Sequence, residues 1–458
     1  MSDLSKPPFA IRNVRLFLAF RVLFNARFYY PVFSVLFLDF GLTLAQFALL
    51  NVVWAVSIVV CEVPSGALAD ILGRRNLLVL AGGLMVVEIM LWAFVPRDNL
   101  HLLFWVFVLN RILSGMAEAA ASGADEALAY DSLVRYGNPA DWSRVLERQI
   151  QLQSAGFVMV MTLGGLVYDP HFVQGALHLV GFDATVTRAA TLRLPIYLTL
   201  ATAVLTLLSA LGMQEVSDSQ QRAAASPSLL AESLKLIWQA ARWIFRTPLV
   251  LGLMLFGLLY DSVVRMLLTM ASQYYRLIGV PEAWFGALGS LLALSGLVMP
   301  VLARRLVTRC SLAFNLLLIA GIILAGLVGM AQLQNYAGLA PALLLFGSFN
   351  LVGFFLSYYL NRLTDSAQRA TVLSFKGLFL NLGYGMIGLL YSFLLALLRG
   401  QVPPSVGAVQ EELLKNRIFA ESLPWFGWYF GICFLLLLGC FTRTFYRSRS
   451  FREALKRP

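Results

Sequence analysis

Long runs of apolar residues, separated by short polar segments, make up nearly the whole chain. A helix of about 20 apolar residues crosses the hydrocarbon core of a bilayer, and most of the runs reach that length. They are also too continuous for the alternating strands of a membrane β-barrel. Twelve membrane-spanning helices are therefore predicted, at residues 15–37, 43–64, 77–95, 101–123, 146–167, 191–213, 248–270, 284–303, 312–331, 337–360, 371–396 and 424–442.

The predicted spans divide into six and six around a polar stretch at residues 214–246. Two six-helix bundles are therefore expected, at residues 1–213 and 247–458, joined by this stretch as a cytoplasmic linker. Within the linker, Ser226 and Pro227 favour a helix start, and apolar residues follow at helical spacing. This segment is either an amphipathic helix on the membrane surface or a plain connecting helix.

Composition and charge support a membrane protein. The chain is 59% hydrophobic and 13% charged, whereas soluble domains carry about 25% charged residues. The net charge of +11 could indicate nucleic-acid binding. However, the basic residues concentrate in the loops on one side of the predicted spans, which is the positive-inside pattern. We therefore expect no nucleic-acid partner, and a multi-pass protein of a bacterial inner membrane with both termini in the cytoplasm.

A short motif lies between the second and third predicted spans, with the sequence GALADILGRRNLL from Gly66 to Leu78. It resembles the signature loop of the major facilitator superfamily. The matching positions are Gly66, Leu68, Asp70, Gly73, Arg74, Arg75 and Leu78, while Ile71 stands where a basic residue is usual. The resemblance implies an all-α membrane fold with twelve helices in two pseudo-symmetric bundles. A weak similarity between the residues leading into the fifth and eleventh spans agrees with such a repeat.

In this family the signature loop acts as a latch that closes the cytoplasmic side. The resemblance implies that Asp70 accepts hydrogen bonds at the start of span 11, where a helix N-terminus is positive. It also implies that Arg74 pairs with an acid at the inner end of span 4. The alternative is a basic loop that only sets topology. The expected gate residues are Gly66, Asp70, Gly73, Arg74, Arg75, Asp125 and Asp131, with Glu126 as a further possible partner of Arg74.

Span 4 carries the most charge. Arg111, Glu118 and Asp125 are spaced by seven residues, so one continuous helix would place them on one face. Charges within a membrane are costly and are expected to face the protein interior or water. Arg111 and Gly115 also resemble a span-4 motif of the family whose arginine is associated with proton transfer. Glu118 is the leading candidate for proton coupling, and the alternative is a static ion pair that fixes helix packing.

The resemblance implies that spans 1, 4, 7 and 10 line a central cavity. In span 1, Asn25 would share a helix face with Arg21, and Arg27 would lie on another face. In span 7, Asp261 and Arg265 are four residues apart and could also satisfy each other within one helix. A buried partner such as Arg21 or Arg27 is plausible for Glu88 in span 3. The expected substrate and proton pathway comprises Arg27, Asn25, Arg111, Glu118, Asp261 and Arg265.

Several classes of protein are excluded by missing motifs. The chain has no ATP-binding P-loop, and its three histidines lie in or beside predicted external loops. The four cysteines lie in or at the ends of apolar runs without metal-ligand spacing. We expect no enzyme activity, no cofactor and no metal. The expected partners are a small-molecule substrate, protons and the lipid bilayer, and we expect a monomer.

The expected function is secondary transport of a small organic solute by alternating access, coupled to protons, with export favoured. In span 5, Val160 and Met161 stand where drug–proton antiporters of the family carry Gly-Pro. Arginines slightly outnumber acids among the cavity candidates, which suits an anionic or zwitterionic solute. Two alternatives remain open: an importer of an organic anion or sugar-like nutrient, and a membrane sensor or scaffold that does not transport.

Overall fold

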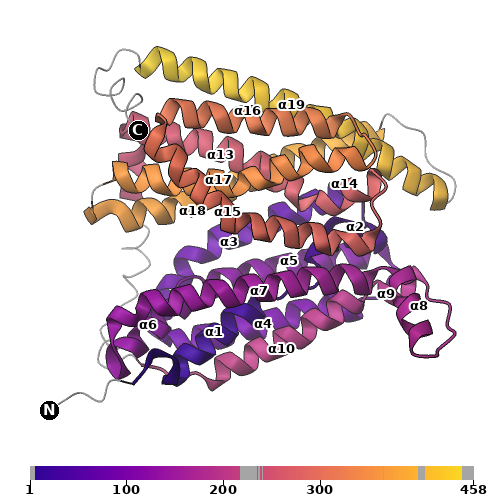
Figure 1. Ribbon diagram of the computed structural model, residues 1–458, viewed down its shortest axis with the longest axis horizontal. Coiled ribbons are helices and arrows are strands. Elements are labelled where there is room, and N and C mark those ends of the chain that lie inside the picture. The colour runs from indigo at the N-terminus through magenta and orange to yellow at the C-terminus, as the bar shows by residue number, and fades with distance from the viewer. Residues whose placement is uncertain are drawn as a thin grey trace. The chain divides into compact units, whose positions relative to one another are not determined.

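A computed structural model describes residues 6–216, 235, 238–239, 241–364, 366–400 and 408–445. Helices account for nearly all of the regular structure in these residues (Figure 1). Eleven of the helical segments are long and apolar enough to cross a membrane, and a shorter apolar segment spans Tyr30–Asp39. The predicted all-helical membrane fold is therefore confirmed. Most of the expected linker helix lies outside the described residues.

The chain forms two compact units. Unit 1 draws on the described residues within Met1–Gly41, Val53–Leu234 and Glu282–Ser290. Unit 2 draws on those within Leu42–Val52, Lys235–Pro281 and Leu291–Pro458. Two helices contribute to both units, since the first turns of α3 belong to unit 2 and the first turns of α15 to unit 1.

Unit 1 packs its helices around α1 and α4. Helix α4 contacts α5, α6 and α10, and α1 contacts α6, α7 and α10. The helices of this unit are α1 (Arg12–Phe24), α2 (Phe33–Asp39), α3 (Leu44–Leu72), α4 (Arg74–Phe94), α5 (Leu100–Ala121), α6 (Ala124–Tyr136), α7 (Trp142–Tyr168), α8 (Pro170–Leu179), α9 (Arg188–Thr191) and α10 (Leu194–Gly212).

Unit 2 is organised around α13, which contacts α17, α18 and α19. Helix α16 packs mainly against α17 and α19. The helices of this unit are α13 (Pro248–Thr269), α14 (Ala271–Leu277), α15 (Phe285–Arg309), α16 (Leu312–Ala331), α17 (Leu339–Leu363), α18 (Ser366–Gly400) and α19 (Ala408–Phe445).

The first predicted span is not the continuous helix expected at 15–37. Helix α1 ends at Phe24, and residues 25–29 are not helical before a 3₁₀ turn at Tyr30–Val32 leads into α2. Asn25 closes α1 by donating from its side-chain amide to the carbonyl of Arg21, 2.8 Å away. Pro31 disfavours an unbroken helix here, because proline lacks a backbone N–H and restricts the residue before it.

The fourth predicted span also ends earlier than a seven-residue pattern through Asp125 requires. Helix α5 stops at Ala121, and Gly123 adopts a left-handed conformation with φ of 75° before α6 begins. Glycine takes this conformation without the strain a side chain would cause. The expectation that Asp125 shares one helix face with Arg111 and Glu118 is therefore wrong, because Asp125 belongs to the next helix.

Candidate functional site

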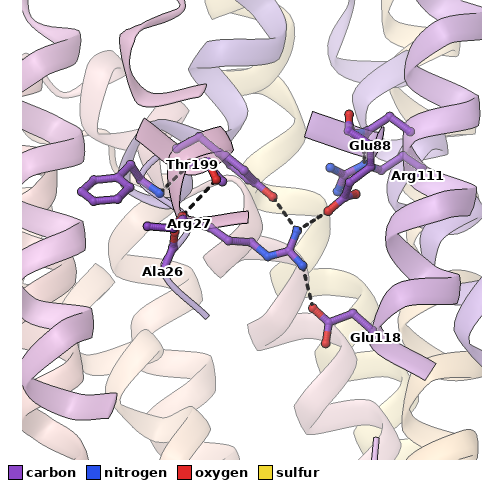
Figure 2. Close-up of polar contacts among 10 residues, drawn as sticks. Ala26, Arg27, Glu88, Arg111, Glu118 and Thr199 are labelled. Carbon is purple, nitrogen blue, oxygen red and sulfur yellow. Dashed lines mark hydrogen bonds and ion pairs between the residues drawn. The ribbon is translucent and has the colours of Figure 1, made fainter. Parts of the chain in front are cut away.

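The centre of the candidate site in unit 1 is Arg27, which lies in the non-helical break and is 1% exposed. Its Nη1 donates to Oε1 of Glu88 on α4 at 2.6 Å. Its Nη2 donates to Oε1 of Glu118 on α5 at 3.2 Å (Figure 2). Tyr29 adds a third contact, at 3.1 Å from Nη1 to its hydroxyl oxygen. One guanidinium thus joins carboxylates from two different helices.

Polar side chains of α10 stabilise the non-helical break at residues 25–29 by hydrogen bonds to its backbone. Thr199 Oγ1 accepts a hydrogen bond from the backbone N–H of Phe28 at 3.0 Å, and Thr202 Oγ1 donates to the carbonyl of Ala26 at 2.9 Å. Figure 2 shows Thr199 beside the break, across from the carboxylates. Backbone groups at membrane depth need such partners, because lipid offers none. Broken helices of this kind line the binding sites of many transporters.

The two carboxylates that contact Arg27 differ in solvent access. The side chain of Glu88 is 0% exposed, whereas that of Glu118 is 33% exposed. Burying three charged side chains away from water is costly unless each charge is paired. Glu88 therefore lies fully enclosed beside Arg27, whereas Glu118 is the more exposed of the two carboxylates.

Arg111 and Glu118, which the spacing placed on one helix face, do not form an ion pair in the structure. Its guanidinium carbon lies 4.9 Å from the ring centre of Trp92 and 5.5 Å from those of Phe33 and Phe37. Its Nε donates to Oδ1 of Asn110 at 3.0 Å. Nη2 is buried and has no hydrogen-bond acceptor among the described residues. Aromatic faces attract a cation, so they stabilise Arg111 in place of a carboxylate.

In unit 2 the two expected pathway residues contact each other. Arg265 Nη2 lies 2.9 Å from Oδ1 and 2.7 Å from Oδ2 of Asp261, one helical turn away on α13. Nη1 of the same arginine donates to Oδ1 of Asn381 on α18 at 2.9 Å. The sequence reasoning missed Asn381, because nothing local marks an asparagine in span 11 as the partner of an arginine in span 7.

The signature motif is mostly helical. Helix α3 runs through to Leu72, and Gly73 alone separates it from α4, with φ of 89°. Arg74 forms an ion pair with Asp131 on α6. Arg75 contacts the segment after α10, through a hydrogen bond from its backbone N–H to Glu215 Oε2 at 3.0 Å. Gly66 and Asp70 lie within α3, but their surroundings are outside the described part of the structure.

The other two acids at the inner end of span 4, Asp125 and Glu126, form ion pairs with Arg21 instead of Arg74. Arg21 Nε lies 2.7 Å from Oδ2 of Asp125, and its Nη2 lies 2.7 Å from Oε1 of Glu126. Of the three acids that the sequence offered to Arg74, only Asp131 is therefore its partner in the structure. Among the residues described, no group of three or more His, Cys, Asp and Glu side chains is arranged to hold a metal ion.

Threonines of α10 are the residues of this site that sequence reasoning did not identify. Thr199 and Thr202 are ordinary members of an apolar span, and threonine in a helix usually bonds to its own helix backbone. A weak signal exists in hindsight, since span 6 carries Thr199, Thr202 and Thr206 at helical spacing. That spacing places several hydroxyls along one side of the helix.

Comparisons with known proteins agree with this architecture. The family model of the Major Facilitator Superfamily matches residues 16–389. No curated protein shows significant sequence similarity to the chain. Among solved structures, the nucleoside transporter NupG is 13% identical, with a TM-score of 0.66 over 92% of this chain and 98% of that one.

Two further solved structures are similar. A bacterial homologue of the human lysosomal transporter Spinster is 14% identical, with a TM-score of 0.66 over 97% of this chain and 98% of that one. The xylose transporter XylE from E. coli is 14% identical, with a TM-score of 0.55 over 93% of this chain and 96% of that one. At these identities the likeness shows the fold, whereas the family match covers most of the chain. The chain belongs to the Major Facilitator Superfamily of membrane transporters and is a multi-pass membrane protein.

Proposed function

We propose that the protein is a proton-coupled secondary transporter of a small organic solute, with Glu118 as the proton-binding group. The observation that carries the proposal is the shared guanidinium of Arg27, 2.6 Å from Glu88 and 3.2 Å from Glu118. Only the second carboxylate is in part exposed. A group that loads and releases protons needs access to water, and the partly exposed side chain of Glu118 supports this role better than the enclosed side chain of Glu88.

The proposed cycle uses the break in the first span. Protonation of Glu118 neutralises its charge and ends its ion pair with Arg27, while Glu88 keeps the guanidinium paired. Because Arg27 lies on the non-helical segment between α1 and α2, a change in its contacts acts directly on that segment. In alternating access, binding of the proton then shifts the equilibrium between two conformations of the transporter.

For the direction of transport we propose export of the solute in exchange for protons. The alternative is uptake together with protons. Two of the similar solved structures are named as transporters of a nucleoside and of xylose, so nucleosides and pentoses are included among the solutes tested. A third possibility, a sensor or scaffold without transport, predicts no solute-driven proton movement at all.

The test is proton movement in proteoliposomes that hold a pH-sensitive dye inside while solutes are added outside. A symporter acidifies the interior as solute enters, whereas an antiporter makes it more alkaline, whichever way the protein is inserted. The panel contains nucleosides, pentoses, organic acids, amino acids and cationic dyes. Export by antiport predicts an alkaline change for at least one class of solute.

The matched variants are Glu118→Gln and Glu126→Gln, which remove one acid each from neighbouring helices of unit 1. Glu118→Gln is expected to abolish the pH change while solute-for-solute exchange continues. Glu126, whose side chain is 45% exposed, is expected to be dispensable for proton coupling. If Glu118→Gln retained the full pH change, Glu118 would not be the coupling group. If no solute of the panel moved with the folded wild type, the proposed transport would be rejected in favour of the sensor.

A further inference from the structure

A second group of buried charges lies in unit 2, and it contains more positive than negative charge. Asp261 and Arg265 pair within α13, with separations of 2.7 and 2.9 Å. Lys376, on α18, is half-buried and close enough to Asp261 to interact with it electrostatically. One carboxylate therefore faces two cations.

The position of Lys376 follows from the helix geometry. It precedes Asn381, the partner of Arg265, by five residues on α18. Five residues correspond to a rise of about 7.5 Å along a helix. Helix α18 packs against α13, which brings the Lys376 segment beside the helix that carries Asp261 and Arg265. Asp261, one turn before Arg265 on α13, interacts with both.

Both cations retain unused hydrogen-bond donors. The Lys376 ammonium donates to Ser357 Oγ on α17 at 3.0 Å, which is its one hydrogen bond to a described residue. An ammonium group has three donors. The Nε of Arg265 is buried and has no acceptor among the residues that the structure describes. The rings of Phe349 and Tyr384 lie 5.9 and 5.4 Å from the guanidinium carbon and hold its position.

An uncompensated positive charge within a membrane is costly. A negatively charged ligand would lower that cost and occupy the free donors, because charge-assisted hydrogen bonds to carboxylate and phosphate are among the strongest that side chains make. Ser357 is a neutral partner and cannot balance the charge of Lys376. The side chain of Arg265 is 22% exposed, so a solute can reach this group.

We propose that Lys376 and Arg265 form an anion-binding subsite in unit 2 that takes one carboxylate or phosphate group of the transported solute. Asp261 holds Arg265 in position and limits the affinity, so that the anion can also leave. That the bound anion belongs to a transported solute rests on the proposed function, but the binding of an anion can be tested without transport. It assigns to the solute a negatively charged group.

The experiment uses inorganic phosphate as the probe. The thermal unfolding of the purified full-length protein is followed while phosphate replaces chloride at constant ionic strength, because a ligand of the folded state raises the unfolding temperature in a saturable way. Wild type is expected to show saturable stabilisation. Lys376→Gln is expected to weaken the apparent affinity for phosphate by about tenfold, as loss of a charge-assisted hydrogen bond implies.

Three further variants make the test specific. Lys376→Arg keeps the charge and is expected to restore phosphate binding to within about threefold of wild type, since arginine also binds phosphate. Arg304→Gln removes an exposed positive charge from α15 of the same unit and is expected to leave the affinity unchanged. Asp261→Asn removes the competing carboxylate and is expected to tighten phosphate binding, which gives a readout in the opposite direction should Lys376→Gln fold poorly.

The proposal is overturned by an unsaturable or absent phosphate effect in wild type. It is also overturned by equal affinities in wild type and Lys376→Gln, or by equal losses in Lys376→Gln and Arg304→Gln. A failure of the proposed proton coupling can be distinguished from a failure of the anion subsite. If no solute drives proton movement but phosphate binding follows the expected order of variants, the proposed transport falls and the anion subsite stands.

Discussion

At the scale of single residues, Arg27 is the buried cation that pairs with two carboxylates of unit 1. Its guanidinium is buried with Glu88, whose side chain has no exposure, and the two are 61 positions apart in the sequence. Such a pair adds little stability compared with an apolar pair of similar size, but removing one partner leaves a buried charge alone. The pair is therefore more important for keeping the break in one conformation than for total stability.

This asymmetry predicts the outcome of a double-mutant cycle. Arg27→Ala is expected to destabilise the protein by about 3–5 kcal/mol, because Glu88 is then buried without its counter-ion. Arg27→Ala combined with Glu88→Ala is expected to be less destabilising than the sum of the two single changes. The measurement is the unfolding temperature of the purified variants in detergent. Strict additivity would show that the two side chains do not act as a pair.

At the scale of elements, the broken first span depends on close packing against α7. A methyl group placed on Gly164 of α7 would overlap the carbonyl of Phe28 within the break. Thr199 and Thr202 of α10 bind the same break from another helix. Two helices thus shape a segment whose own sequence, apart from Pro31, favours a continuous apolar helix.

We therefore predict that Gly164→Ala is strongly destabilising or inactivating. The matched control is Gly175→Ala on α8, where an added methyl group meets no atom within 4 Å. Gly175→Ala is expected to be neutral or slightly stabilising, because alanine favours a helix by about 1 kcal/mol over glycine. The readouts are the unfolding temperature and, once a solute is known, its transport rate. Equal behaviour of the two variants would contradict the close approach.

At the scale of the whole molecule, the charge distribution predicts how the protein lies in its membrane. The turn at Pro139–Asp141 follows span 4 and is expected in the cytoplasm, whereas residues 180–187 follow α8 and are expected outside. Ala140 and Asp183 are exposed positions in these two segments. Both termini are proposed to be cytoplasmic on the same grounds.

Cysteine labelling tests this orientation. In a chain whose four cysteines are replaced by serine, Asp183→Cys is expected to react with a membrane-impermeant maleimide in intact cells. Ala140→Cys is expected to react only in inverted membrane vesicles. Labelling of Ala140→Cys in intact cells would reverse the proposed topology, and labelling of both positions would show that one segment has been assigned to the wrong side.

The all-helical membrane fold could be predicted from the sequence, because span length and hydropathy are local properties of the chain. Membership of the Major Facilitator Superfamily was predicted from the resemblance of the motif from Gly66 to Leu78. The residue types of the site could also be predicted, since a charge within an apolar run is visible by itself, as at Arg27, Glu88 and Glu118. Pairing could not be predicted in the same way. Spacing favoured Arg111 beside Glu118, but the aromatic rings of Phe33, Phe37 and Trp92 stabilise Arg111 instead.

The sequence by itself determined which segments are long and apolar enough to cross a membrane and which charged residues interrupt them. Only the tertiary structure decided where the first span breaks and which acid each arginine contacts. The physical reason is distance along the chain. The break is stabilised by Thr199, 171 positions from Phe28, and Arg265 reaches Asn381, 116 positions away. Contacts of this kind depend on how helices pack, which no local pattern of apolar and polar residues specifies.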